Sequence, residues 1–335
     1  MTTLGVIGLG RIGAFHTETL SNLAGVDGLV VTDERPDVVA AVAAKHGAKP
    51  VDSVEQLLDS GIDGVVVAAA TPAHAELTLA AVAKGLPTFC EKPIAATAAE
   101  SARVAEVIAR SGVPVQVGYQ RRFDAAFAAA KQAVDDGTLG KLHTVRSTTM
   151  DPAPPPFEYL AGSGGIFRDC AVHDFDVLCW ITGQRAVEVY ATGSVQGDPR
   201  LREIADVDTA VVVVTFENGT LGVVSAARYN ARGYDCRLEV HGFDDSVVAG
   251  WDQGVPVRNT DPHTSFPEGP AHHFFMDRFT DAFRTELAAF VDVTKGSPTT
   301  GATVANAVEV AWLAEAATES LHRHAPVRIE EVQAR

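Results

Sequence analysis

Short apolar runs alternate with longer Ala-rich segments through the first third of the chain. The apolar runs are rich in β-branched residues and predict strands at Leu4–Ile7, Leu29–Val31, Gly64–Ala68, Pro87–Cys90 and Val113–Val117, with a weaker candidate at Ala48–Val51. The Ala-rich segments have helical spacing and predict helices at Arg11–Leu23, Pro36–His46, Ser53–Ser60, Ala73–Lys84 and Thr97–Ser111. Because strand and helix alternate with short connections, we expect a parallel sheet covered by helices on both faces, which is an α/β domain.

The pattern changes after Tyr119, where a helix is predicted over Asp124–Asp135 and a strand over Leu142–Thr149. A Pro-rich loop, "DPAPPPFEYLAGSGG", leads to another predicted helix over Asp169–Ile181. Longer alternating strands are then predicted at Val187–Ser194, Asp208–Phe216, Thr220–Ala226 and Cys236–Val240. Strands that follow one another without helices favour antiparallel pairing, so this part is predicted to be an α+β domain with a large, mainly antiparallel sheet.

Two late helices are predicted over Phe275–Lys295 and Thr303–His322, where they either cover this sheet or return to the first domain. We therefore expect a dinucleotide-binding domain over residues 1–120. A substrate-binding and oligomerisation domain is expected over residues 121–335.

The charge balance limits the partners that this protein can have. The 43 acidic and 27 basic side chains give a formal net charge of −16 at pH 7, which would repel nucleic-acid phosphates over most of the surface. No polybasic stretch is present to bind an anionic membrane, and no apolar run reaches the roughly 20 residues of a membrane span. The chain begins without the basic segment of a signal peptide, so no signal peptide is expected. From the charge and the missing polybasic and apolar runs, we expect no nucleic-acid or membrane partner.

The cysteine and histidine spacing argues against a metal site and against disulfides. The four cysteines lie far apart and form no C-x-x-C pair, which is typical of a protein of the reducing cytoplasm. The pair His272-His273 and the run His322–His324 have no accompanying acids or cysteines, so no bound metal is expected.

The segment "GLGRIG" places Gly8, Gly10 and Gly13 in G-x-G-x-x-G spacing between a predicted strand and a predicted helix. In such a turn the first glycine permits the tight bend, the second lets the backbone approach a pyrophosphate, and the third lets helix and strand pack closely. The phosphates would bind the free N–H groups at the start of the helix, near Arg11 and Ile12. The first domain is therefore predicted to be Rossmann-like and to bind a dinucleotide.

An acid at the end of the second strand bears on which dinucleotide is bound. Asp33 lies about 20 residues after the third glycine, where a carboxylate can accept hydrogen bonds from the adenosine ribose and repel a 2′-phosphate. This favours NAD. Arg35 is the opposite signal, because a nearby arginine can accommodate that phosphate, so NADP stays open. The alternative interpretation of this segment is a solvated turn before the next helix.

A second stretch, "FCEKPIA", ends the strand at Pro87–Cys90. Ligands of open parallel sheets bind beyond the carboxyl ends of the strands, so Glu91 and Lys92 are predicted to face the same crevice as the glycine turn. A lysine there can donate to a substrate oxygen and stabilise negative charge that develops on it. Pro93 fixes the local backbone, and its peptide bond can be cis. Taken alone, a Glu-Lys pair at a strand end is more often surface charge.

The stretch "GGIFRDCAVHDFDVLCWITG" spaces Asp169, His173 and Asp176 so that one helix would carry all three on one face. Oxidising an alcohol by hydride transfer releases a proton, and histidine is the side chain suited to take it near neutral pH. A nearby carboxylate can orient the imidazole and stabilise its cationic form. Taken alone, the spacing also fits an N-capping aspartate with an ion pair one turn later.

Taken together, these features resemble the glucose–fructose oxidoreductase, inositol dehydrogenase and rhizopine catabolism (Gfo/Idh/MocA) family. The resemblance spans nearly the whole chain, and the inositol 2-dehydrogenase branch is the most similar. The segments that carry it are "GVIGLGRIGAFH", "ATPAHAEL", "CEKPIA", "GYQRRFD", "SGGIFRDCAVHDFD", "GYDCRLEVHG" and "DAFRTELAAFVD".

The resemblance implies a role for individual residues. Lys92 contacts the reacting hydroxyl, His173 is the catalytic acid or base, and Asp169 completes a catalytic triad. The residues implied at the cofactor are Gly8, Gly10, Arg11, Ile12, Gly13, Asp33, Arg35, Thr71, Pro72, His74, Glu91 and Lys92. The residues implied at further substrate hydroxyls are Arg121, Asp151 and Tyr234.

The resemblance also implies an activity and an assembly. It implies an NAD-dependent dehydrogenase that oxidises a ring hydroxyl of a cyclic polyol, first of all myo-inositol. It also implies a dimer or tetramer built through the second domain's sheet. Gln120, Asp151 and Cys170 stand where a familiar inositol-dehydrogenase pattern has Met, Asn and Thr, which leaves the polyol open. The alternatives are an aldose or nucleotide-sugar dehydrogenase of the same family, or a non-catalytic NAD-sensing regulator.

Overall fold

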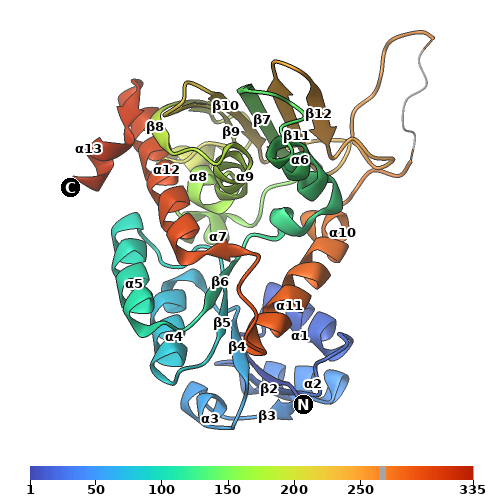
Figure 1. The fold of residues 1–335 in the computed structure, drawn as a ribbon, viewed down its shortest axis with the longest axis vertical. Helices are drawn as coiled ribbons and strands as arrows, with labels where there is room; N and C mark the ends of the chain where they lie inside the picture. Colours follow the sequence, from blue (N-terminus) through green and yellow to red (C-terminus); the bar gives the residue numbers. More distant parts are fainter. Residues whose placement is uncertain (264–268, 335) are drawn as a thin grey trace. The chain divides into compact units, whose positions relative to one another are not determined.

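The chain forms two compact units in the computed structural model, which describes residues 1–263 and 269–334 (Figure 1). The first unit contains Met1–Phe123 and Asp281–Glu309, and the second contains Asp124–Thr280 and Val310–Arg335. The sequence-based division placed every residue after 120 in the second domain. In the structure, residues 281–309 belong to the first unit, because Leu287 and Phe290 of the late helix pack into its hydrophobic core.

The first unit is built on a seven-stranded sheet with the order β13-β6-β5-β4-β1-β2-β3. All neighbouring strands are parallel except β13, which pairs antiparallel with β6. The strands are β1 (Thr3–Ile7), β2 (Gly28–Thr32), β3 (Lys49–Pro50), β4 (Gly64–Val67), β5 (Thr88–Glu91), β6 (Val115–Gly118) and β13 (Ala302–Thr303). The predicted parallel α/β domain is confirmed.

Helices alternate with these strands as the Ala-rich segments predicted. They are α1 (Arg11–Ser21), α2 (Pro36–His46), α3 (Val54–Leu58), α4 (Thr71–Ala83), α5 (Ala98–Ser111) and, late in the chain, α11 (Thr280–Thr294). Gly47 and Gly112 follow α2 and α5 in the left-handed conformation, which ends a helix at little cost only for residues such as glycine. Val65, Val66 and Val67 of β4 are all fully buried, as expected for a strand covered on both faces.

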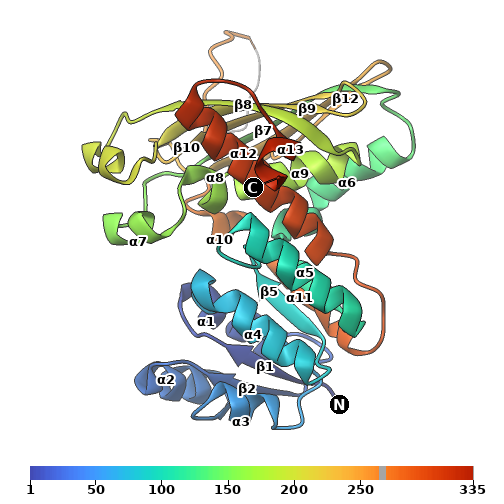
Figure 2. The ribbon, with the colours of Figure 1, turned by 90° about the vertical axis from the view of Figure 1, so that its left-hand side faces the viewer.

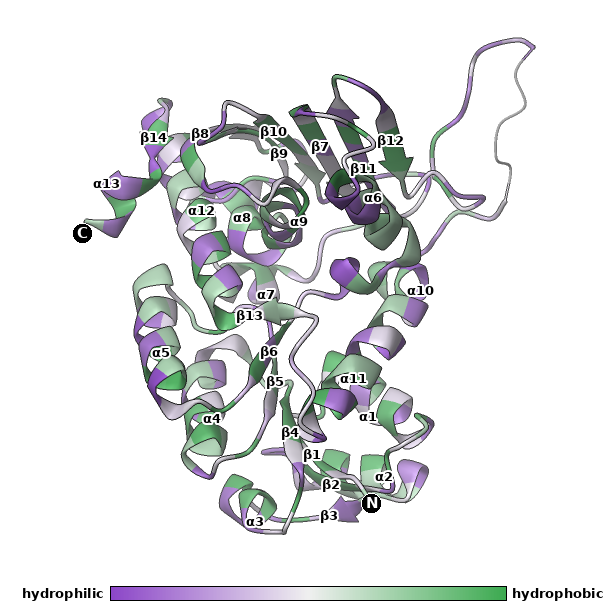
Figure 3. Cartoon of the chain, in the orientation of Figure 1, coloured by the Kyte–Doolittle hydropathy of each residue, from purple (hydrophilic) through white to green (hydrophobic). Residues whose placement is uncertain are grey.

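The second unit contains another seven-stranded sheet, with the order β12-β11-β7-β10-β9-β8-β14. Its strands are β7 (Leu142–Met150), β8 (Ala186–Ser194), β9 (Thr209–Phe216), β10 (Leu221–Ala227), β11 (Asp235–Gly242), β12 (Ser246–Ala249) and β14 (Val327–Arg328). Every neighbouring pair is antiparallel except β7 and β10, which run parallel. The predicted mainly antiparallel sheet is confirmed, and Figure 3 shows hydrophobic residues along the strands of both sheets.

The helices of the second unit differ from the predicted ones at three places. They are α6 (Ala125–Asp135), α7 (Phe157–Gly162), α8 (Ile166–Asp169), α9 (Val172–Thr182), α10 (Phe275–Arg278) and α13 (Ile329–Gln333). The 3₁₀ helix η2 (Pro199–Ile204) also lies in this unit, and α12 (Val304–Arg323) begins in the first unit and ends in the second. A further 3₁₀ helix, η1 (Gln120–Phe123), belongs to the first unit.

The single helix predicted over Asp169–Ile181 is wrong, because α8 and α9 replace it. The amide of Ala171 donates to the carbonyl of Ile166, five residues earlier, so the regular i to i−4 ladder stops there. The single helix predicted over Phe275–Lys295 is likewise divided into α10 and α11. A further helix, α7, lies in the segment that was predicted to be a Pro-rich loop.

The sheet of the second unit has one covered face and one open face (Figure 2). On the covered face, α9 packs on β7, and Ser320 of α12 accepts a hydrogen bond of 2.9 Å from the amide of Ala191 in β8. On the open face, cross-strand partners form a continuous row: Tyr190, Val213, Val223, Arg146, Glu239 and Val248. Tyr190, Val213 and Val248 are 41, 36 and 51% exposed, which is unusual for large apolar residues of a sheet.

Candidate functional site

The glycine turn connects β1 to α1, and two of its glycines are required by packing. Gly8 has φ +89°, and a Cβ atom there would lie 2.5 Å from the backbone of Ala69. A Cβ atom on Gly13 would lie 1.9 Å from the carbonyl oxygen of Gly8. A Cβ atom on Gly10 would meet no protein atom within 4 Å. Gly10 thus keeps open the side from which a pyrophosphate would approach the backbone.

The start of α1 suits an anion. Gly10 is the N-cap residue and supplies no side-chain acceptor to the first N–H groups of the helix. The first turn contains no acidic residue, and Arg11 is exposed while Ile12 is half-buried. The free N–H groups and the positive end of the helix dipole therefore fit the diphosphate of a dinucleotide.

Asp33 follows β2 and is tied to the glycine turn. Its carboxylate accepts a 2.6 Å hydrogen bond from the amide of Leu9 and a 3.0 Å hydrogen bond from Nε of Arg35. Burial alone would raise the pKa of Asp33, but the hydrogen bonds from Arg35 and Leu9 outweigh burial and lower the pKa below the usual value of an aspartate. The Arg35 side chain is 57% exposed, so its guanidinium lies over the carboxylate at the surface.

Thr71, Pro72 and His74 lie in the first turn and a half of α4, but they have different environments. Pro72 is exposed and Thr71 is half-buried, whereas His74 is only 2% exposed. The ring of His74 contacts the carbonyl oxygen of Pro93 through Nδ1 at 2.7 Å and that of Ala69 through Nε2 at 2.9 Å. His74 therefore holds two segments of main chain together.

Glu91 is the last residue of β5, and Lys92 follows it at the strand end, as predicted. The Glu91 carboxylate is buried and lies 2.6 Å from Nε2 of His16 in α1, so this acid connects the strand to the dinucleotide helix. Lys92 is half-buried, and the Lys92–Pro93 bond is cis. Gly118 of β6 packs against Glu91, where a Cβ atom would lie 3.0 Å from the carboxylate.

In the second unit, Asp169 ends α8 and is held by two side chains from other elements. Its carboxylate accepts a 2.9 Å hydrogen bond from the Tyr159 hydroxyl and a 3.1 Å hydrogen bond from Nη1 of Arg228. Arg228 is 1% exposed, and its Nη2 lies 4.0 Å from Asp206. Burial alone would lower the pKa of Arg228, but the adjacent carboxylates, Asp169 first, raise it and keep the guanidinium charged.

Sequence reasoning missed Arg228. The residue directly follows the apolar strand "LGVVSAA", where the chain turns out of the sheet, and that position was the available signal. A charged residue after a buried strand is common at protein surfaces, so the signal did not separate Arg228 from an exposed arginine.

His173 lies in the first turn of α9 and is half-buried. The neighbouring acid Asp174 is completely buried and accepts hydrogen bonds from Ser147 at 2.5 Å and Thr149 at 2.8 Å, which tie α9 to β7. Asp176 is also completely buried. The two acids that follow the histidine in sequence thus lie in the interior of the unit, whereas His173 is half-buried.

The parallel pairing of β7 and β10 gathers polar residues at one edge of the second sheet. Met150 pairs with Ala227 and with Asp235, so the residues just beyond them, Asp151, Arg228 and Tyr234, lie at the same edge. The thiol of Cys170 lies 3.9 Å from the Asp151 carboxylate. Burial, followed by the negative charge of Asp151, raises the pKa of the Cys170 thiol well above its usual value, so the group is neutral at pH 7.

The predicted site residues divide between the two units. The residues predicted at the cofactor lie in the first unit together with Arg121, which is 2% exposed in η1 next to the buried Gln120. Asp151, Asp169, His173 and Tyr234 lie in the second unit. The predicted approach of Lys92 to His173 stays a prediction.

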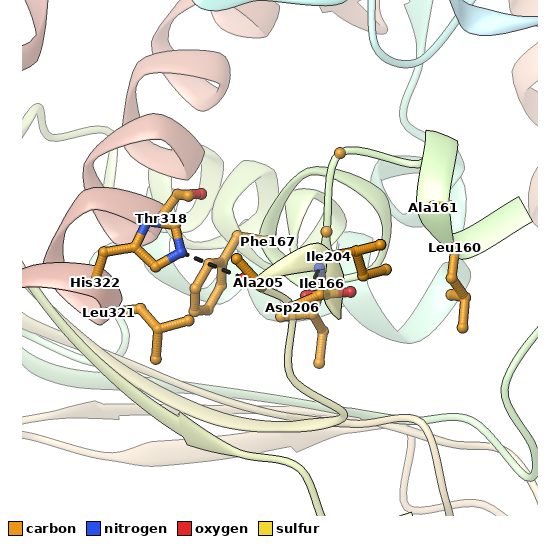
Figure 4. Close-up of a pocket in the computed structure, with 12 residues that line it drawn as sticks. Leu160, Ala161, Ile166, Phe167, Ile204, Ala205, Asp206, Thr318, Leu321 and His322 are labelled. Atoms are coloured by element: carbon orange, nitrogen blue, oxygen red, sulfur yellow. Dashed lines mark hydrogen bonds between the residues drawn. The ribbon is translucent and has the colours of Figure 1, made fainter. Parts of the chain in front are cut away.

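A cavity of about 210 Å³ also lies in the second unit, and none of the predicted site residues lines it (Figure 4). Its apolar walls include Leu160, Phe167 and Leu321, and the ring of His322 contacts the carbonyl of Ala205 at 3.3 Å. Asp206 lies in its wall and accepts a 2.9 Å hydrogen bond from the amide of Ile166 at the start of α8. This carboxylate therefore helps to fix the short helix that ends in Asp169.

The described part of the chain, residues 1–263 and 269–334, contains no group of three or more His, Cys, Asp or Glu residues placed to hold a metal ion. No helix in those same ranges is long and apolar enough to cross a membrane. All four cysteines are buried, and none of them forms a disulfide.

Comparison with known proteins connects both units to one family. Residues 2–119 match the oxidoreductase family with an NAD-binding Rossmann fold, and residues 127–248 match the GFO/IDH/MocA C-terminal domain. The chain is 37% identical over 332 residues to the myo-inositol 2-dehydrogenase of Thermotoga maritima. This match covers 98% of this chain and 99% of that protein. It is 33% identical over 330 residues to the scyllo-inositol 2-dehydrogenase (NAD(+)) of Bacillus subtilis, covering 97% and 95%.

The solved structures agree with this result. The crystal structure of a myo-inositol dehydrogenase from Corynebacterium glutamicum has a TM-score of 0.90 and 31% identity, and the match covers 98% of each chain. The Rossmann turn, the NAD cofactor and the family that the sequence indicated are all confirmed. The chain belongs to the Gfo/Idh/MocA family of oxidoreductases, with an NAD-binding Rossmann domain.

Proposed function

We propose that this protein is an inositol 2-dehydrogenase, which oxidises one ring hydroxyl of myo-inositol to a ketone with NAD. The observation that carries the proposal is the 37% identity, over 98% of the chain, to the myo-inositol 2-dehydrogenase of Thermotoga maritima. The presence of Lys92, Asp169 and His173 in this chain is consistent with that chemistry.

Each of the three side chains has one step in the proposed mechanism. Lys92 donates a hydrogen bond to the reacting oxygen and stabilises the negative charge that develops there. An imidazole nitrogen of His173 accepts the hydroxyl proton. Asp169, held by Tyr159 and Arg228, stabilises the imidazolium that results. Bound NAD supplies the hydride acceptor, so the carbinol carbon loses two electrons and becomes a carbonyl.

We assign the remaining substrate hydroxyls to Arg121, Asp151 and Tyr234. Guanidinium, carboxylate and phenol groups donate to or accept from hydroxyl groups in different combinations, so they distinguish ring stereoisomers. Asp151 is acceptor-only when ionised and lies near a neutral thiol. This combination is where we expect the choice among inositol isomers to be made.

The test is the initial rate of NADH formation over a panel of substrates. The panel contains myo-, scyllo- and D-chiro-inositol, glucose, galactose, xylose and a nucleotide sugar, each with NAD and with NADP. We expect the highest kcat/KM for myo-inositol with NAD. A preference for scyllo-inositol would correct the isomer, and a preference for an aldose or nucleotide sugar would overturn the proposal. NAD binding without NADH formation on any member would support a regulator instead.

We also propose that the protein is a cytoplasmic homo-oligomer, a dimer or tetramer, that associates through the open face of the second sheet. Tyr190, Val211, Val213, Leu221 and Val248 support this, because each is an apolar side chain at least 36% exposed on a strand. A second copy of the same face would bury them. The four buried cysteines, none of them in a disulfide, fit a reducing compartment.

A further inference from the structure

We propose that His74 is a positioning residue that remains protonated at neutral pH and, as an imidazolium, holds the Lys92–Pro93 segment against the glycine turn. The inference deepens the proposed function, since it rests on a catalytic role for Lys92. The sequence placed His74 among the cofactor contacts. In the structure, both of its ring nitrogens contact main-chain carbonyl oxygens of the protein.

The protonation state follows from the two acceptors. Nδ1 lies 2.7 Å from the carbonyl oxygen of Pro93, and Nε2 lies 2.9 Å from the carbonyl oxygen of Ala69. A carbonyl oxygen can only accept a hydrogen bond, and a neutral imidazole carries a hydrogen on only one of its nitrogens. The other nitrogen would then point a lone pair at a carbonyl lone pair at hydrogen-bond distance. The imidazolium donates to both.

The surroundings favour the charged form in spite of burial. His74 is 2% exposed, so water does not compete for either carbonyl. Burial alone would lower the pKa of His74, but Cys90 on β5 and the carbonyls of Pro93 and Ala69 raise it to about 9. Cys90 is a titratable side chain that faces the ring.

One carbonyl, that of Pro93, belongs to the segment that carries Lys92, and the other, that of Ala69, lies in the connection between β4 and α4, which packs against the glycine turn. Ala69 lies two residues after the end of β4. It packs so closely on Gly8 that a Cβ atom built on Gly8 would lie 2.5 Å from the backbone of Ala69. Pro93 follows Lys92 directly. A single cation therefore connects the turn predicted to bind the diphosphate with the residue predicted to bind the reacting oxygen. Loss of one donor would release one of these segments.

The protonation state can be measured without substrate, by nitrogen NMR of protein labelled with ¹⁵N in its histidine rings. The His74 signals are assigned by their loss in His74→Gln. We expect both ring nitrogens of His74 to carry hydrogens from about pH 6 to about pH 8, beyond the ordinary range of histidine. A singly protonated ring at neutral pH would overturn the proposal, whether or not the protein oxidises inositol.

The positioning role is tested by kinetics of His74→Gln. A glutamine amide has its donors on one nitrogen, so it cannot reach two carbonyls on opposite sides of a ring. We expect kcat with the best substrate to fall about 100-fold, as for a misplaced catalytic group, while the Kd for NAD changes less than tenfold. The matched control is His322→Gln, because the exposed His322 ring contacts one carbonyl, that of Ala205, and we expect unchanged kcat.

The pH profile separates positioning by a charge from a purely structural role. Wild-type His74 loses one of its two donors as the pH rises through about 9, so the difference in kcat between wild type and His74→Gln should narrow there. A constant ratio across this range, or full activity of His74→Gln, would overturn the proposal. An inactive wild type that still shows a doubly protonated ring would reject the proposed function and leave the imidazolium in place.

Discussion

Buried charged side chains determine how the reactive residues are held. Asp169 is fixed by Tyr159 and the buried Arg228, and Glu91 is fixed by the buried His16. A buried charge that lacks a partner costs several kcal/mol, so each pairing also restricts where its carboxylate can point. The residues expected to do chemistry, Lys92 and His173, are only half-buried, which leaves them accessible to a substrate.

At the residue scale, Lys92→Ala and His173→Ala should each lower kcat about 10³-fold, because each removes a group that acts on the reacting hydroxyl. Neither substitution alters the glycine turn or Asp33, so the Kd for NAD should stay nearly unchanged. Stopped-flow NADH formation and fluorescence titration with NAD measure the two quantities. Normal turnover in both variants would contradict the proposed mechanism.

The raised pKa of His74 predicts how stability depends on pH. The pKa is about 9 in the folded protein and 6.5 ordinarily, so the stabilisation by this group is fully present below pH 6.5 and is lost as the pH rises to about 9. The full effect corresponds to about 3 kcal/mol. Urea unfolding of wild type and His74→Gln should give a difference in unfolding free energy that shrinks over this window. A difference independent of pH would contradict the assignment.

At the scale of secondary structure, the interruption between α8 and α9 determines where the Asp169 carboxylate lies. A continuous helix would have put Asp169 and His173 one turn apart on one face, as the sequence predicted. Because α8 ends at Asp169, that carboxylate instead accepts a hydrogen bond from Arg228. Arg228 directly follows β10, at the end of the sheet where β10 pairs in parallel with β7. Asp206 fixes the other end of α8 through the amide of Ile166.

Arg228 connects these elements, so its substitution should disturb both fold and activity. Arg228→Met leaves the buried Asp206 and the half-buried Asp169 without their cation, and we expect a loss of about 3–5 kcal/mol of unfolding free energy. Arg228→Lys keeps the charge but not the planar fork, so it should fold and lose mainly kcat. Urea unfolding and steady-state rates distinguish the two.

The control for Arg228 is Arg200→Met, which breaks an exposed pair with Asp198. This substitution should change the unfolding free energy by less than about 1 kcal/mol. If the two Met substitutions lowered the unfolding free energy equally, the prediction that the buried Arg228 stabilises the fold more than an exposed arginine would be wrong.

At the scale of the whole molecule, the two units contribute different parts of the proposed chemistry. The first unit binds the dinucleotide and carries Lys92, and the second carries Asp169 and His173. The open face of the second sheet carries the row from Tyr190 to Val248, which crosses six of the strands.

Association through that face can be tested with a charge in its centre. Val213→Glu places a carboxylate on β9, and we expect sedimentation velocity to show monomers in place of the oligomer, because burying an unpaired charge is costly. The control is Val107→Glu, on an exposed position of α5, which should leave the oligomer intact. An unchanged oligomer in Val213→Glu would place the interface elsewhere.

Helices and strands were predicted accurately where neighbouring residues in the sequence determine them, and less accurately where contacts between distant residues do. Helix α2 was predicted to the residue, because Pro36 begins it and the left-handed Gly47 ends it, and both signals are local. The division between α8 and α9 was missed because it depends on a hydrogen-bond shift at Ala171 that no residue type announces. The pairing of β7 with β10 joins residues about 80 positions apart, beyond the reach of periodicity.

The sequence alone determined the parallel α/β unit, the glycine turn, the candidate Lys92, Asp169 and His173, and the family, since each depends on local spacing or on motifs of a few residues. Only the tertiary structure decided that Arg228 holds Asp169, that Glu91 pairs with His16, and that His74 bridges two carbonyls. The physical reason is that a buried polar group must find its partner wherever the packed chain offers one. That partner is set by contacts between distant segments and not by neighbours in the sequence.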